Sequence, residues 1–126
     1  MKILVVDDSV VQRKVVIKIL REASFTNEIL EASNGQEAIQ QLGTNHKDVG
    51  LILCDWNMPV MSGIDFVEGV AKVPVLSKIP LMMVTTEGTQ TKIEEARSKH
   101  PFLAGYIVKP FTPDQLKVKI QPFLKA

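Results

Sequence analysis

This sequence has little cysteine and no long apolar run, and it is not expected to carry a leader segment. A single cysteine among 126 residues cannot form an internal disulfide, and this usage fits a reducing compartment. The apolar runs are far shorter than the roughly 18 residues that a transmembrane helix needs. Residues 1–6 run directly into two aspartates, which is not the pattern of a signal peptide. We therefore expect a cytoplasmic protein with no membrane partner.

An excess of charge of one sign is lacking as well. The 15 lysines and arginines nearly balance the 14 aspartates and glutamates, which gives a formal net charge of +1. Nucleic-acid-binding domains usually carry a basic patch or run, so no nucleic-acid partner is expected. The hydrophobic share of 45% and the length are typical of a globular protein with one domain.

Short apolar runs alternate with longer segments of helical periodicity, five times over. The runs are residues 3–6, 28–32, 51–54, 81–84 and 104–108. Most are continuously apolar, which indicates parallel strands covered on both faces, whereas the more polar second run is expected at an edge. A βα unit repeated five times predicts an α/β fold with five helices around a doubly wound parallel sheet. The simplest strand order is 2-1-3-4-5, which is flavodoxin-like.

The helical segments carry start signals and apolar stripes. Ser9 and the pair Thr112-Pro113 are typical helix starts. The predicted stripes of the first and last helices are Val15, Val16, Ile19, Leu20 and Ala23, and Leu116, Ile120, Phe123 and Leu124. Pro122 is expected to break or kink the last turn of the final helix.

Polar residues follow four of the five predicted strands. Asp7 and Asp8 follow the first strand, Asp55 the third, Thr85 the fourth and Lys109 the fifth. Ligands of such sheets bind outside the carboxyl ends of the strands. We therefore expect these side chains to meet at one edge of the sheet.

Three carboxylates at one edge repel each other. A pair about 4 Å apart costs about 4 kcal/mol at an effective dielectric constant near 20. Either some carboxyls are protonated or a cation lies among them. Oxygen ligands without clustered histidine or cysteine favour Mg²⁺, Mn²⁺ or Ca²⁺ over zinc, and Mg²⁺ suits a site that is completed by water or phosphate oxygens. A carboxylate is also a nucleophile toward phosphorus, so the set fits phosphoryl transfer to Asp55.

Each of these residues alone also has an ordinary structural explanation. Asp8 can cap a helix together with Ser9, and Asp55 can be a turn residue at the end of a strand. Lys109 can be a surface lysine. Their joint placement at the ends of four strands is what favours a functional site.

Several motifs resemble one known family along the whole chain. They are VVDDS at 5–9, DWNMPVMSG at 55–63, VTT at 84–86 and GYIVKPF at 105–111. These motifs are similar to those of the receiver domains of two-component response regulators, and most similar to those of stand-alone chemotaxis regulators. The resemblance implies a single receiver domain, residues 1–126, with no output domain.

The resemblance also implies a Mg²⁺ site at the phosphoacceptor, with Mn²⁺ as a substitute. Asp55 would accept the phosphoryl group of a histidine kinase. Asp8 would bind Mg²⁺ directly, Asp7 through water, and Asp55 with the backbone carbonyl of Asn57 would complete the protein ligands. Lys109 would pair with the phosphate.

The remaining implied roles concern switching and phosphoryl lifetime. Thr85 would be the switch hydroxyl and Tyr106 the switch aromatic. Asn57 and Glu87 match the positions that tune phosphoryl lifetime. A cis peptide bond is expected between Lys109 and Pro110.

The predicted function is therefore a signalling switch rather than an enzyme, although it would take part in its own phosphorylation and dephosphorylation. Phosphorylation of Asp55 would change the face formed by the fourth helix, the fifth strand and the fifth helix. The expected partners of this monomer are a histidine kinase, a flagellar motor switch protein and a phosphatase.

Three alternatives remain open from the sequence. The domain can serve as a phosphate shuttle in a phosphorelay, or as a binding module with a vestigial site. A flavin- or nucleotide-binding enzyme of the same fold is also conceivable, because fold does not fix function. Such an enzyme needs a phosphate-binding loop after the first strand, where Asp7 and Asp8 would repel phosphate unless a metal intervened.

Overall fold

A five-stranded parallel sheet in the order β2-β1-β3-β4-β5 forms the centre of the described structure. This computed structural model describes residues 1–56, 63–86 and 90–124. The strands are β1 (Lys2–Val6), β2 (Ile29–Ala32), β3 (Val49–Asp55), β4 (Leu81–Thr85) and β5 (Leu103–Val108). All neighbouring strands are parallel. The predicted fold class, the strand order and the edge position of the second strand are confirmed.

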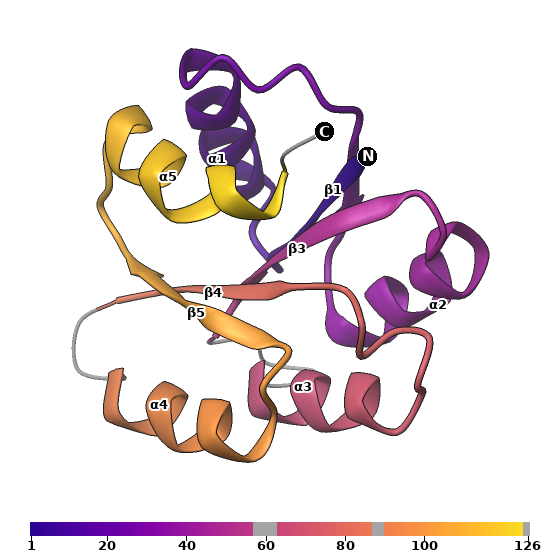
Figure 1. Cartoon of the computed structure of the whole chain (residues 1–126). Helices are drawn as coiled ribbons and strands as arrows, with labels where there is room; N and C mark the ends of the chain where they lie inside the picture. The colour runs from indigo at the N-terminus through magenta and orange to yellow at the C-terminus, as the bar shows by residue number, and fades with distance from the viewer. Residues whose placement is uncertain (57–62, 87–89, 125–126) are drawn as a thin grey trace.

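Helices cover both faces of the sheet. Within the described ranges the helices are α1 (Val10–Glu22), α2 (Gly35–Asn45), α3 (Gly63–Ala71), α4 (Gln90–Lys99), α5 (Pro113–Ile120) and a short 3₁₀ helix, η1 (Gln121–Phe123). Helices α1 and α5 lie on one face, and α2, α3 and α4 lie on the other (Figure 1). Among the described helices, none has the length and apolarity to cross a bilayer.

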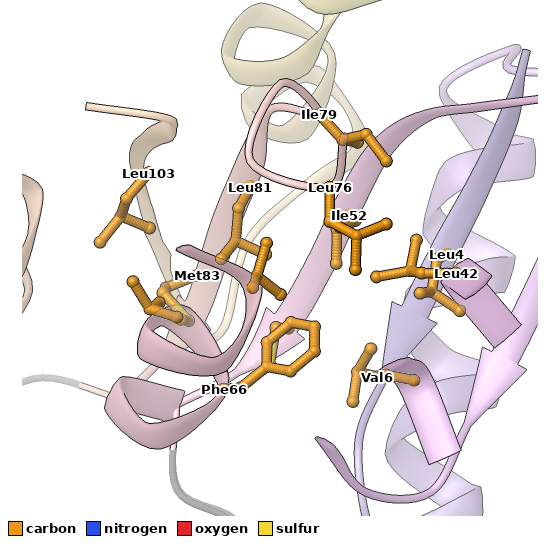
Figure 2. Close-up of a cluster of buried hydrophobic side chains, with 14 of the residues drawn as sticks. Leu4, Val6, Leu42, Ile52, Phe66, Leu76, Ile79, Leu81, Met83 and Leu103 are labelled. Carbon is orange, nitrogen blue, oxygen red and sulfur yellow. The ribbon is translucent and has the colours of Figure 1, made fainter. Parts of the chain in front are cut away.

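The core consists of two hydrophobic clusters separated by the sheet. Alternate residues of a strand point to opposite faces, so Ile3 joins the cluster under α1 and α5 while Leu4 joins the cluster under α2, α3 and α4. Figure 2 shows part of the second cluster, in which Phe66 of α3 lies among side chains of the strands. Burial on both faces explains why the strands are continuously apolar in sequence.

Two residues of the predicted helical stripes are in fact solvent-exposed. Val15 is 50% exposed because the buried side of α1 is centred on Val16 and Leu20, and one residue turns an α-helix by about 100°. Phe123 is 37% exposed because it belongs to η1, whose tighter winding moves it off the stripe of α5. The predicted break at Pro122 is confirmed, since η1 follows directly on α5.

Candidate functional site

The carboxyl ends of three strands deliver the predicted acidic and basic residues to one place. Asp55 is the last residue of β3, Asp7 follows β1, and Lys109 follows β5. Backbone hydrogen bonds continue past the strand ends, from Asp7 N to Ala32 O at 3.1 Å and from Lys109 N to Thr85 O at 2.7 Å. The sheet therefore fixes the backbone of these residues. The peptide bond between Lys109 and Pro110 is cis, as the resemblance implied.

Asp7, Asp8 and Asp55 form an acidic cluster. Each offers one carboxylate oxygen, and these oxygens lie within 4.8 Å of one another. Asp7 and Asp55 are buried, with 3% and 8% of their surface exposed, whereas Asp8 is exposed. The Ser9 backbone N–H donates to Asp7 Oδ1 at 2.9 Å, which orients that carboxylate. Close, hard oxygen donors of this kind fit a divalent cation such as Mg²⁺ or Mn²⁺.

Lys109 places its ammonium group beside this cluster. Its Nζ lies 3.6 Å from Asp7 Oδ2 and 4.0 Å from Asp55 Oδ1. It also donates a hydrogen bond to Gln12 Oε1 on α1. Asp55, the candidate nucleophile, thus has an ammonium group and two further carboxylates in its immediate surroundings.

The cluster lines an open hollow with a volume of about 300 Å³. Its lining residues are Asp7, Asp8, Ser9, Gln12, Asp55, Thr86 and Lys109. A hollow of this size accommodates a metal ion and a phosphoryl group, each far smaller than a drug-sized ligand.

Thr85 lies next to the hollow but is fully buried. It is the last residue of β4, and its hydroxyl donates to the Thr86 carbonyl at 3.3 Å. The following residue, Thr86, is exposed and lines the hollow. The structure thus brings Asp7, Asp8, Asp55 and Lys109 together and leaves the Thr85 hydroxyl beneath the surface.

Tyr106 is half-buried on β5, opposite Met83 of β4. Its ring packs against the cluster under α2, α3 and α4, and Lys119 Nζ of α5 lies 5.8 Å from the ring centroid. Two predicted site residues, Asn57 and Glu87, lie outside the described residues.

Sequence reasoning missed two residues beside the acidic cluster: Gln12, which accepts a hydrogen bond from Lys109, and Arg13, which binds the backbone of Asp7. Arg13 Nη1 donates to the Asp7 carbonyl at 2.6 Å, and its Nε donates to Glu31 of β2 at 3.1 Å. Hydrogen bonds from Lys14, and then from Arg13, hold the pKa of Glu31 below its ordinary value. The sequence gives no sign of the Arg13–Glu31 pair, whereas Gln12 could have been found, because it lies one helical turn after Asp8.

Cys54 is fully buried on β3, immediately before Asp55. Its thiol donates to the Asp55 carbonyl at 3.4 Å. Burial, followed by the negative charges of Asp55 and Asp7, raises the pKa of the Cys54 thiol well above its ordinary value. The thiol therefore stays protonated in the folded protein at a pH where it ionises in the unfolded chain.

We expect this thiol to make the fold less stable at alkaline pH. Below the pKa of the thiol in the unfolded chain, roughly 8.5, the thiol is protonated in both states. It therefore does not change the free energy of unfolding with pH in that range. Above that pH only the unfolded chain loses the proton, so the free energy of unfolding falls by about 1.4 kcal/mol per pH unit. Urea denaturation of the wild type and Cys54→Ala between neutral pH and alkaline pH measures this slope. The same slope in both proteins would contradict the assignment.

A family model described as the response regulator receiver domain matches residues 3–121. The match covers most of the chain, so the chain belongs to the receiver domains of response regulators. The resemblance of the motifs is thereby confirmed.

Individual relatives narrow the class to CheY-like receiver domains. Chemotaxis protein CheY1 of Helicobacter pylori is 40% identical over 124 residues, which cover 98% of this chain and 97% of the relative. Chemotaxis protein CheY of Pseudomonas aeruginosa is 40% identical over 121 residues, covering 96% and 94%. The solved structure of CheY4 of Vibrio cholerae aligns with a TM-score of 0.81 at 34% identity and covers 98% of both chains.

Proposed function

We propose that this CheY-like domain is the phosphoaccepting regulator of a chemotaxis pathway, and that Asp55 takes a phosphoryl group from a histidine kinase in a Mg²⁺-dependent reaction. The observation that carries the proposal is the acidic cluster with Lys109 Nζ at 4.0 Å from Asp55 Oδ1. The names of the relatives, which are chemotaxis proteins, support the pathway.

The reaction needs a nucleophile and groups that stabilise the charge of the transferring phosphoryl group. An Asp55 carboxylate oxygen attacks the phosphorus of a phosphohistidine. The new P–O bond forms as the P–N bond breaks, and the electron pair leaves with the imidazole nitrogen, which takes up a proton. Lys109 pairs with one phosphoryl oxygen. Asp7, Asp8 and Asp55 would hold Mg²⁺, which would supply further positive charge to the transferring group. Attack of water on the aspartyl phosphate reverses the modification, so the domain takes part in both steps.

The switch starts from the charge that the phosphoryl group adds, about −1.5 to −2. The Thr85 hydroxyl leaves the Thr86 carbonyl and donates to a phosphoryl oxygen instead. This movement frees space on the side of β4 that faces Tyr106, and the Tyr106 ring turns inward. Helix α4 shifts readily when the Tyr106 ring turns inward, because the buried residues of α4 are only Ile93 and Ala96.

The face formed by α4, β5 and α5 is the proposed docking surface for a flagellar motor switch protein. Exposed Lys117 and Lys119 on α5 suit an acidic peptide of that partner. The curated relatives are matched over 97% and 94% of their own length. The receiver domain, in this proposal, acts as a monomer in the cytoplasm, with a kinase and a phosphatase as further partners. A flavin or nucleotide enzyme is disfavoured, because Asp7 and Asp8 stand where a phosphate-binding loop is needed.

Trp56 offers a direct test, because it follows Asp55 and is 8% exposed. We expect Mg²⁺ to change its fluorescence, and acetyl phosphate to cause a further change only when Mg²⁺ is present. The physical reason is that both additions alter the charge beside the indole. Titration with Mg²⁺, with EDTA reversal as the control, measures the first step. A protein without any response to either addition would contradict the proposed function.

A further inference from the structure

Gln12 and Lys109 are 97 residues apart in the chain and joined by a hydrogen bond from Lys109 Nζ to Gln12 Oε1. An ammonium group has only donors, so the Gln12 amide must turn its oxygen toward Lys109. The two side chains also form the boundary between two cavities. One is the acidic hollow, and the other is an apolar groove of about 220 Å³ between α1 and residues 109–111.

The position of the ammonium group is the unusual feature. Gln12 Oε1 lies within hydrogen-bond distance of Lys109 Nζ, whereas Asp7 Oδ2 and Asp55 Oδ1 lie at 3.6 and 4.0 Å, beyond the range of a direct hydrogen bond. A lysine side chain is flexible and would gain a strong charge-assisted bond by moving onto either carboxylate. The contact with Gln12 opposes that movement.

The distances from Lys109 Nζ to the carboxylates of Asp7 and Asp55 determine whether these carboxylates can bind a divalent cation. A lysine bonded directly to Asp7 and Asp55 would occupy the oxygens that a divalent cation needs, and it would reduce the nucleophilicity of Asp55. A lysine held at the rim still neutralises part of the charge through space. It also stays within reach of a phosphoryl group on Asp55.

We propose that Gln12 is a positioning residue that holds the Lys109 ammonium at the rim of the hollow and so keeps Asp7 and Asp55 open to a divalent cation. This inference rests on the proposed function of the site and deepens it. Gln12 acts through Lys109, whose ammonium group is the one that lies beside Asp55.

The test replaces Gln12 by methionine, which has a similar length and fits a helix but offers no strong acceptor. The dissociation constant for Mg²⁺, measured by Trp56 fluorescence, is expected to rise about fivefold in Gln12→Met, because Lys109 then competes for the carboxylates. The matched control is Gln40→Met, the same change at an exposed position of α2 on the other face of the sheet, and it should leave the affinity unchanged.

A double-mutant cycle separates positioning from a general structural effect. In a Lys109→Met background, Gln12→Met should no longer alter the Mg²⁺ affinity. An unchanged affinity in Gln12→Met, or an equal loss in the Lys109→Met background, would overturn the inference.

The outcomes for Gln12 and for the proposed function are distinguishable. A wild-type protein that binds Mg²⁺ but takes up no phosphate refutes phosphoryl transfer, while the fivefold effect of Gln12→Met still supports the positioning role. Normal phosphorylation of a Gln12→Met variant with unchanged Mg²⁺ affinity refutes only the positioning role. Absence of Mg²⁺ binding by the wild type refutes both.

Discussion

Asp55→Asn is expected to abolish covalent phosphate incorporation and to leave the fold intact. The amide has nearly the same shape as the carboxylate but is not a nucleophile toward phosphorus. Asp55 is 8% exposed and belongs to a cluster of three carboxylates, so loss of its charge also relieves repulsion. We therefore expect the variant to be at least as stable as the wild type.

Intact-mass spectrometry after incubation with acetyl phosphate and Mg²⁺ measures the incorporation, and circular dichroism measures the fold. The matched control is Asp48→Asn, which makes the same change at an exposed residue just before β3, at the opposite end of that strand. This control should incorporate phosphate like the wild type. Phosphate on Asp55→Asn at the wild-type level would show that another residue is the acceptor.

Phe66→Ala is expected to lower the free energy of unfolding by about 3–5 kcal/mol. Phe66 is fully buried on α3 and belongs to the same hydrophobic cluster as Val6, Ile52 and Leu42 (Figure 2). Truncation removes apolar surface and leaves a cavity that the rigid sheet cannot close.

Urea denaturation followed by circular dichroism measures the loss for Phe66→Ala. Val118→Ala, at a position of α5 that is 75% exposed, is the control and should change the free energy by less than about 0.5 kcal/mol. If the alanine variant does not fold, Phe66→Leu provides a smaller cavity and a smaller expected loss. A loss below about 1 kcal/mol in Phe66→Ala would contradict the packing of α3 described above.

The sheet and much of the site could be predicted from the sequence because each depends on simple rules. Continuous apolar runs predict buried parallel strands, and the polar residue after each run must lie at the carboxyl edge. The strand predicted from residue 51 begins two residues too late, because Gly50 is typical of a loop and β3 begins at Val49. In the structure Gly50 is buried in β3 against Met1, where a Cβ atom would lie 2.8 Å from Met1 Cβ.

The parts that the sequence could not predict depend on packing between distant segments. The choice between Val15 and Val16 as the buried residue requires the rotation of α1 against the sheet, which periodicity alone leaves open within one position. The bond between Lys109 and Gln12 requires the relative position of β5 and α1. Neither can be read from local patterns.

The separation of the core into two clusters has an evolutionary consequence. The sheet lies between the layer under α1 and α5 and the layer under α2, α3 and α4, so substitutions in one layer have few shared neighbours in the other. Descendants of this domain can therefore remodel the packing of one layer while the opposite layer keeps its ancestral side chains. Because the two layers can change independently, this fold can acquire new side-chain packing in one layer and still fold.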